Sequence, residues 1–193
     1  MAEAETVPEL KSVPVNPSVA AEGSAAPEPA EAFNEIYDRH FSFVWRCLRG
    51  LGIPAAALDD AAQDVFLVVH RQLAAFRGDS SARTWLFGIT RNVAGNHLRR
   101  ARRKQAPLEP LVEDPAHPAP GPHEHAEDAQ AAAFVADFLA GLDAKKRELF
   151  ILSVLEEMTM PEVAAALSIP LNTAYTRLRR VRAAFEAALG RLS

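Results

Sequence analysis

The 193-residue sequence has a single cysteine, Cys47, and no long hydrophobic run. One thiol cannot form an internal disulfide, and it stands in no metal-ligand spacing. No stretch of about twenty apolar residues is present, so no membrane-spanning helix is expected. The first residues also lack the basic start and apolar core of a secretion signal. These absences predict a soluble, cytoplasmic protein without membrane insertion.

Motifs typical of enzymes are missing as well. There is no glycine-rich phosphate loop, no nucleophile motif and no pair of carboxylates inside an apolar segment. His117, His123 and His125 are candidate metal ligands, but they fall in a proline-rich stretch with no fixed scaffold around them. A polar linker is the simpler interpretation of that stretch. We therefore expect neither an enzyme nor a protein that holds a metal ion or another cofactor.

Charge is unevenly distributed along the chain, although the formal net charge is only −4. Residues 1–32 carry six acidic side chains and one basic one, and residues 106–128 carry six acidic side chains without Lys or Arg. The rest of the chain has 20 basic and 13 acidic side chains. Seven of these bases lie in residues 83–104 and five in residues 172–193. Two separate basic surfaces indicate a nucleic-acid-binding protein.

Hydrophobic periodicity predicts an all-α protein with two small helical domains. The apolar residues are mostly Ala, Leu and Val, which favour helix, and no segment is typical of a strand. Two segments lack apolar periodicity and are rich in proline and acidic residues, so they are predicted as a tail and a linker. The predicted segments are a disordered acidic tail (1–29), an amino-terminal helical domain (30–105), the acidic linker (106–126) and a carboxyl-terminal helical domain (127–193).

The third predicted helix, which runs from residue 83 past residue 100, has one face suited to single-stranded DNA. Successive residues turn by about 100° around a helix, so side chains at these spacings fall in one narrow stripe. An aromatic ring stacks on bases, amides bond base edges and guanidinium groups neutralise phosphates. The alternative is a core tryptophan followed by a solvated, basic helix end. The stripe consists of Trp85, Asn92, Asn96, Arg99 and Arg103.

The second predicted helix carries the opposite charge at its start. Asp60, Gln63 and Asp64 share one face at i, i+3 and i+4 spacing, next to Asp59. Because an acidic face repels DNA, within a DNA-binding domain it indicates a protein partner. The alternative is that these acids only favour the positive end of the helix dipole.

The carboxyl end has the pattern of a helix-turn-helix. Thr159 and Glu162 have capping-box spacing and predict a short helix that ends near Leu167. A turn at residues 168–170 follows, and Asn172 or Thr173 is predicted to cap a longer helix. The buried stripe of that helix is predicted as Ala174, Leu178, Val181, Phe185 and Leu189. The opposite face is predicted as Thr173, Tyr175, Thr176, Arg179, Arg180 and Arg182, with Arg177 at its edge.

A short helix, a tight turn and a long helix with an arginine-rich face is the geometry that places a helix in the major groove. The alternative is an ordinary helical hairpin with a solvated basic face. In favour of that alternative, Ser168 stands where a left-handed turn would accept Gly at a lower cost.

Together these segments resemble the extracytoplasmic-function (ECF) group of the sigma-70 family. Residues 59–66, DDAAQDVF, are similar to the family's core-polymerase-binding helix in region 2. Residues 76–86, FRGDSSARTWL, are similar to its promoter-melting segment, and the match continues through RNVA at 91–94 and HLRR at 97–100. The helix-turn-helix resembles region 4. The resemblance covers the whole chain except the tail and the linker.

The resemblance implies an all-α fold in which a region 2 helical bundle and a region 4 helix-turn-helix are joined by a flexible linker. It implies a non-catalytic sigma factor that directs promoter-specific transcription initiation. The implied partners are core RNA polymerase, through the clamp helices of its β′ subunit and through its β subunit, promoter DNA at the −10 and −35 elements, and an anti-sigma factor.

The resemblance also assigns roles to individual residues. Polymerase contacts are expected from Asp59, Asp60, Gln63 and Asp64. Contacts with the −10 element are expected from Asp79, Ser80, Ser81, Arg83, Trp85, Asn92, Asn96, Arg99 and Arg103. Contacts with the −35 element are expected from Asn172, Thr173, Tyr175, Thr176, Arg177, Arg179 and Arg180.

Two positions depart from the family pattern. Asn172 stands where Gly is usual, and Tyr175 stands where a basic or small polar residue is usual. Because both lie on the expected reading face, the −35 sequence cannot be transferred from relatives. The alternative function is a stand-alone helix-turn-helix regulator, which would normally bind a palindrome as a dimer. That alternative explains the carboxyl-terminal domain but neither the aromatic-amide stripe nor the acidic face.

Overall fold

The structure is a computed structural model that describes residues 29–104 and 125–191. The tail predicted for residues 1–29 and the linker predicted for residues 106–126 lie almost entirely outside this part of the chain. His117 and His123 lie outside it as well. Among the helices that the structure describes, none is long and apolar enough to cross a membrane.

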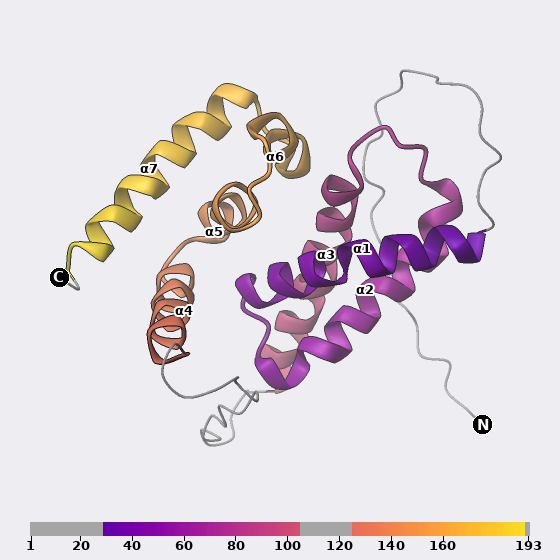
Figure 1. The fold of residues 1–193 in the computed structure, drawn as a ribbon, viewed down its shortest axis with the longest axis horizontal. Coiled ribbons are helices and arrows are strands. Elements are labelled where there is room, and N and C mark those ends of the chain that lie inside the picture. Colours follow the sequence, from indigo (N-terminus) through magenta and orange to yellow (C-terminus); the bar gives the residue numbers. More distant parts are fainter. Residues whose placement is uncertain (1–28, 105–124, 192–193) are drawn as a thin grey trace.

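Every regular element in the described residues is helical, and these elements form two groups (Figure 1). The first group comprises α1 (Pro29–Gly50), the 3-10 turn η1 (Ala55–Ala57), α2 (Leu58–Gln72), the 3-10 turn η2 (Leu73–Ala75) and α3 (Ala82–Lys104). The second group comprises α4 (His125–Ala140), α5 (Ala144–Phe150), the π-helical turn η3 (Ile151–Leu155), α6 (Met160–Leu167) and α7 (Leu171–Leu189). The all-α prediction is confirmed.

In the amino-terminal half, α1, α2 and α3 pack together as a three-helix bundle. Each helix buries one apolar face, and these faces meet in a common core. On α3 the residues Leu86, Ile89 and Val93 are all buried in this core. Helix α2 ends at Gln72, and the chain continues as the 3-10 turn η2.

In the carboxyl-terminal half, aromatic rings join α4, α5 and α7. The ring of Phe185 lies 5.0 Å from that of Phe138 and 5.2 Å from that of Phe150, centroid to centroid. Asp143 caps α5, since its carboxylate accepts a hydrogen bond of 3.0 Å from the Lys146 amide. These contacts hold the helices that carry the helix-turn-helix.

Two predictions about α7 are wrong. Pro170, in extended conformation, occupies the N-cap position, so Asn172 and Thr173 lie inside the first turn instead of capping it. Leu189 is exposed, and Ala188 is buried at the end of the helix in its place. The rest of the predicted stripe faces the core: Ala174, Leu178 and Val181 are buried and Phe185 is half-buried.

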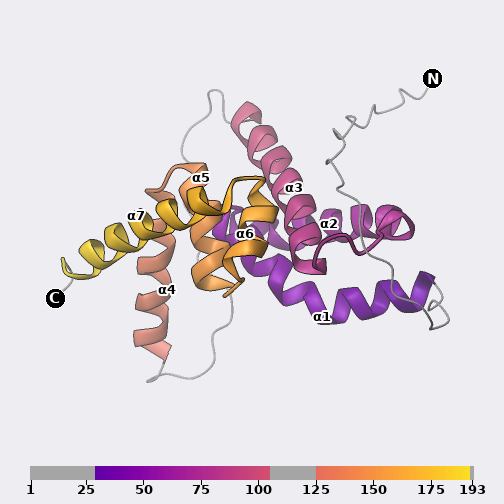
Figure 2. The same cartoon turned by 90° about the horizontal axis from the view of Figure 1, so that it is seen from above.

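The two halves pack against each other. Helix α6 lies against α3, and η3 lies against α1 (Figure 2). The buried residues of both halves form one hydrophobic cluster. At the end of α1 the approach is so close that a Cβ added to Gly50 would lie 2.9 Å from Ile151 Cδ1. We refer to this contact region as the seam.

Candidate nucleic-acid interface

Helix α3 carries the predicted aromatic-amide stripe along one flank. Trp85, Asn92 and Asn96 are partly exposed, and Arg99 and Arg103 are exposed. The Arg99 guanidinium donates a hydrogen bond to the Asn96 side-chain oxygen, which joins two members of the stripe. The structure therefore leaves amide and guanidinium groups available on one helix face, as recognition of unpaired bases requires.

Trp85 is part core residue and part surface residue. Its ring packs against the hydrophobic core from the outside and stacks on Phe76, with ring centroids 4.5 Å apart and an interplanar angle of 23°. Phe76 comes directly after η2, so the stacked pair ties the segment before α3 to the helix itself. The interpretations of Trp85 as a core residue and as a DNA contact are compatible, because its ring is only partly buried.

The segment that enters α3 turns sharply at Gly78, whose φ is +73°. Ser81 caps the helix: its hydroxyl accepts a hydrogen bond of 3.3 Å from the Thr84 amide. Asp79 is exposed, with an Arg77 nitrogen 3.7 Å from its carboxylate, and Ser80 is partly exposed. The predicted −10 residues Asp79, Ser80 and Ser81 thus lie together on one short loop.

Arg83 does not join the stripe. Its guanidinium points across the seam to Glu156, donating to the backbone carbonyl at 2.7 Å and to the carboxylate at 3.1 Å. It also lies 4.7 Å from the centre of the Phe43 ring. Of the nine predicted −10 residues, this one is held by protein groups of the other half.

The acidic face lies at the start of α2. Asp59 and Asp60 are exposed in its first turn, and Gln63 is exposed one turn later. Asp64 is half-exposed and lies 2.8 Å from a ring nitrogen of His97 on α3. This contact connects the acidic face of α2 directly to α3.

The helix-turn-helix forms as predicted. The Glu162 carboxylate accepts hydrogen bonds from the Thr159 amide at 3.0 Å and from its hydroxyl at 2.7 Å, within the predicted capping box. These donors lower the pKa of Glu162. Ser168 adopts the left-handed conformation that the turn requires, with φ of 52°.

On α7 the predicted −35 residues fall into two groups. One group lines a single open hollow of the surface, and the other is exposed beside it. The hollow is lined by Asn172, Thr173, Thr176, Arg177 and Arg180. The second group is Tyr175, 53% exposed, and Arg179, also exposed. Both groups offer hydrogen-bond donors of the kind that read base edges and phosphates.

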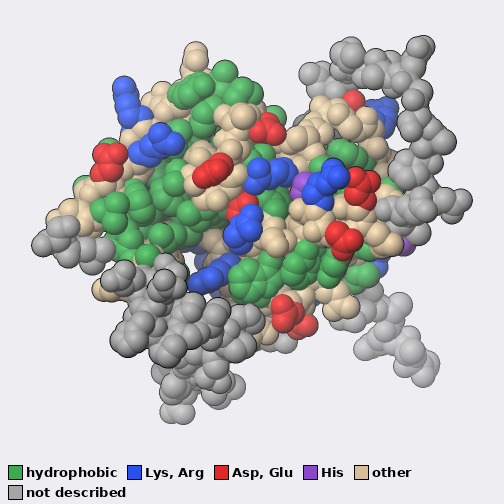
Figure 3. Space-filling view, viewed as in Figure 1, with side chains coloured by type: hydrophobic (Ala, Val, Ile, Leu, Met, Phe, Trp, Pro, Cys, Tyr) green, Lys and Arg blue, Asp and Glu red, His purple; other side chains and the backbone are tan. Residues whose placement is uncertain are grey.

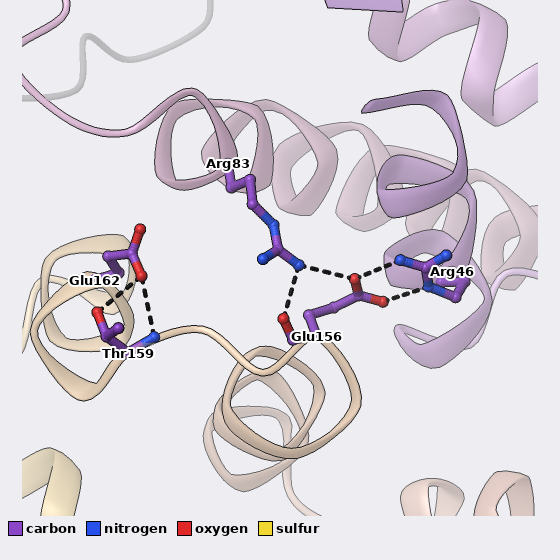
Figure 4. Close-up of polar contacts among 5 residues, drawn as sticks. All are labelled: Arg46, Arg83, Glu156, Thr159 and Glu162. Carbon is purple, nitrogen blue, oxygen red and sulfur yellow. Dashed lines mark hydrogen bonds and ion pairs between the residues drawn. The ribbon is translucent and has the colours of Figure 1, made fainter. Parts of the chain in front are cut away.

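The residues at the seam were not predicted. Glu156 has a side chain only 1% exposed, and Arg46 donates to both of its carboxylate oxygens at 2.7 Å (Figure 4). A weaker pair joins Arg91 of α3 to Glu148 of α5 at 3.5 Å. Burial raises the pKa of Glu148, and Arg91 opposes that shift. The one sequence signal was an acid next to the apolar run 149–155, whose partners cannot be read from local spacing.

Cys47 is fully buried, and burial raises its pKa, so the thiol stays protonated and serves as core filling. Among the described residues, no cluster of His, Cys, Asp or Glu has the arrangement of a metal site.

Comparison with known proteins extends these observations to both halves. The family "Sigma-70 region 2" matches residues 36–104, and "Sigma-70, region 4" matches residues 135–185. The sigma factor CnrH of Cupriavidus metallidurans is 32% identical over 173 residues, which cover 86% of this chain and 90% of CnrH. The ECF sigma factor SigC of Mycobacterium tuberculosis is 32% identical over 144 residues, covering 75% of this chain and 76% of SigC.

Solved structures show the same fold. CnrH in complex with the cytosolic domain of CnrY superposes with a TM-score of 0.63 at 28% identity, covering 86% of this chain and 96% of CnrH. The sigma factor RpoE of Bartonella quintana, solved with the anti-sigma factor NepR, superposes with a TM-score of 0.66 at 21% identity, covering 83% and 98%. With both regions matched in order, this chain belongs to the ECF group of sigma-70 RNA polymerase sigma factors and is a non-catalytic subunit for transcription initiation.

Proposed function

We propose that the amino-terminal half docks on core polymerase and opens the −10 element, while the carboxyl-terminal half reads the −35 element. The observation that carries this proposal is the opposite charge of two adjacent helices. Helix α2 presents Asp59, Asp60 and Gln63 to solvent, whereas α3 presents amides and arginines. One bundle therefore offers a face for a basic protein partner beside a face for DNA.

The polymerase contact of this proposal is made by the acidic face, and its partner is the clamp helices of the β′ subunit. Asp64 belongs to this acidic face and also contacts His97 of α3, so binding of the polymerase at α2 affects α3 through this pair. We propose the β subunit as the partner of the carboxyl-terminal half, where Leu155 and Leu189 are exposed apolar side chains. The chain acts in the cytoplasm, together with the polymerase.

The −10 contact of this proposal is made by two sets of residues. The loop residues Asp79, Ser80 and Ser81 help to open the duplex. The stripe holds the separated bases: Trp85 supplies stacking surface, Asn92 and Asn96 bond base edges, and Arg99 and Arg103 contact phosphates. Stacking contributes roughly 1–3 kcal/mol per base and needs no duplex, so it favours the open strand. Arg83 is assigned to the phosphate backbone near the same site.

The −35 contact of this proposal is made by α7 in the major groove. The residues of the hollow and the exposed pair Tyr175 and Arg179 form the reading face. A bidentate arginine-guanine contact discriminates by roughly 1–3 kcal/mol. The two DNA sites together gain from effective concentration once the polymerase fixes their spacing.

An anti-sigma factor completes the proposed set of partners. CnrH, a relative over most of its length, has been solved with the cytosolic domain of CnrY. This supports a regulatory protein that binds the present chain before core polymerase does.

The test is transcription in vitro with purified core polymerase and a promoter library that includes the gene's own upstream region. We expect core-dependent transcripts that Trp85→Ala and Asn92→Ala abolish. A matched control is Asn34→Ala, which removes an exposed amide of α1 outside the proposed sites. On a template whose −10 region is already unpaired by mismatches, both variants should regain part of their activity, because the melting step is bypassed.

The rival function predicts a different result. A stand-alone regulator would form no complex with core polymerase and would bind a duplex site tightly as a dimer. Such a result, or transcription that is equally strong with Trp85→Ala and Asn92→Ala on closed templates, overturns the proposed assignment.

A further inference from the structure

The seam contains one buried carboxylate with two arginine partners. Glu156 follows the π-helical turn η3 in the carboxyl-terminal half, whereas Arg46 lies on α1 and Arg83 at the start of α3 (Figure 4). Arg46 binds the carboxylate with two nitrogens, and Arg83 binds both the carboxylate and the main-chain carbonyl of Glu156. Two-pronged pairs of this type are the strongest hydrogen-bonded contacts between side chains. We refer to these three residues as the clasp.

The charges of the whole seam are complementary. The amino-terminal half supplies the guanidinium groups of Arg46, Arg83 and Arg91, and the carboxyl-terminal half supplies the carboxylates of Glu148 and Glu156. Figure 3 shows basic and acidic side chains next to one another across the middle of this face. A contact held in this way can be opened by a competing anion, since the amino-terminal half can pair with any group of negative charge.

The clasp engages Arg83, which the proposed function needs for contact with DNA. Arg83 is assigned to the −10 phosphates, yet its side chain is 34% exposed and its Nη2 atom donates to Glu156. Next to it, the Ser81 hydroxyl and the Arg83 charge both help to lower the pKa of Glu162 on α6. The Arg83 side of the first turn of α3 therefore lies against the carboxyl-terminal half, whereas Asp79 and Ser81 stay exposed.

We propose that this packing is an autoinhibited, closed state in which Glu156 takes the place of a promoter phosphate on Arg83 and withholds this contact from DNA. The proposal rests on the −10 role assigned to Arg83. Core polymerase opens the clasp when it binds the two halves at separate places. Before that, only the open fraction of the protein offers Arg83 to DNA, so its apparent affinity is reduced by that fraction.

The first measurement is the distance between the halves in the full chain. Spin labels are attached at Ala74→Cys on η2 and Ala184→Cys on α7, both exposed positions, and read by pulsed electron paramagnetic resonance. Cys47 takes no label, because it is fully buried and its pKa is raised. We expect one narrow distance in the parent, and a broad, longer distribution in Glu156→Gln. The matched control Glu157→Gln changes the adjacent, exposed acid and should keep the narrow distance.

The second measurement is binding of a fluorescent single-stranded oligonucleotide without polymerase. Glu156→Gln should bind it about tenfold more tightly than the parent if about one molecule in ten is open in the parent. Arg83→Gln should also open the clasp, but without this gain, because it loses the phosphate contact. The difference between the two variants shows whether binding improves because Arg83 is released or only because the two halves move apart.

Arg46→Gln is a second variant that tests the proposal even where Glu156→Gln does not fold. Its side chain is half-exposed, and it is not assigned to DNA, so it should open the halves and strengthen binding in a folded protein. A parent whose distance distribution already equals that of Glu156→Gln overturns the proposal. So does an unchanged narrow distance in both Glu156→Gln and Arg46→Gln. The distances do not depend on transcription, so a failure of the proposed function alone leaves them as expected.

Discussion

Within residues 29–104 and 125–191, two residues other than glycine have left-handed backbone conformations, Glu157 with φ of 51° and Ser168 with φ of 52°. Ser168 closes α6, and its conformation lets the amide of Ile169 donate to the carbonyl of Ala164 at 3.0 Å. A residue with a Cβ pays roughly 1–2 kcal/mol in this region. The turn of the helix-turn-helix therefore holds one residue, Ser168, in a strained backbone conformation.

Ser168→Gly should raise the free energy of unfolding by up to about 1 kcal/mol, because glycine adopts this conformation without strain. Urea denaturation followed by circular dichroism measures the change. Ala183→Gly in the exposed middle of α7 is the matched control and should lower the same quantity by roughly 0.5–1 kcal/mol. A Ser168→Gly protein less stable than its parent would contradict the claim that Ser168 is strained.

At the scale of the element, α6 depends on its capping box. The carboxylate of Glu162 accepts from both the amide and the hydroxyl of Thr159, and these donors lower its pKa below the ordinary value of 4.5. Helix α6 has only eight residues, so one satisfied end is a large part of its local stability.

The stabilisation by Glu162 should depend on pH. A lowered pKa in the folded state means that the carboxylate stabilises α6 above about pH 4.5, and that this stabilisation is lost as the pH falls through the folded pKa. We expect the difference in unfolding free energy between the parent and Glu162→Gln to be constant from neutral pH down to about pH 5 and to shrink below it. Denaturation curves over a pH series measure this difference.

The same series in a Thr159→Ala background tests the cause. Without the hydroxyl donor, the difference between Glu and Gln at position 162 should depend less on pH. A dependence as steep as in the parent would show that Thr159 is not what lowers the pKa.

Local elements of this fold could be predicted from the sequence because their causes lie within a few residues. The capping box of Thr159 and Glu162 was predicted from spacing and is present. The cap of α7 was predicted wrongly, because Pro170 takes the N-cap position two residues before the first candidate, Asn172. Leu189 fits the stripe as the residue four after Phe185, but the buried face continues at Ala188, three residues after Phe185.

The candidate site divides in the same way. The stripe on α3 follows from helical period alone, so its members could be predicted together. The pairing of Arg83 with Glu156 spans 73 residues and that of Arg46 spans 110, and no local pattern encodes such contacts. The DNA-facing role of each residue on the stripe and on α7 stays a prediction.

At the scale of the whole molecule, the two halves approach each other closely at Gly50. A Cβ there would lie 2.9 Å from both Cδ1 and Cγ1 of Ile151, so one of the two halves must shift to accept it. The absence of a side chain at this position is therefore a condition for the packing of η3 on α1.

Gly50→Ala should lower the free energy of unfolding by roughly 1–3 kcal/mol, as overpacking does in other cores. In an Ile151→Ala background the same change should cost much less, because the colliding atoms are gone. Gly88→Ala on α3 is the control: no atom lies within 4 Å of the added carbon, so it should be neutral or stabilising. Equal losses from Gly50→Ala in both backgrounds would rule out the collision with Ile151.

The clasp also limits how the two halves can be exchanged between relatives. A hybrid that takes its carboxyl-terminal half from a protein without an acid at position 156 leaves Arg46 and Arg83 without the carboxylate that pairs with them. A hybrid made the other way buries a carboxylate without a partner, at a cost of roughly 3–5 kcal/mol. In such hybrids, residues 46, 83 and 156 must therefore be exchanged together, although they lie in different halves of the chain.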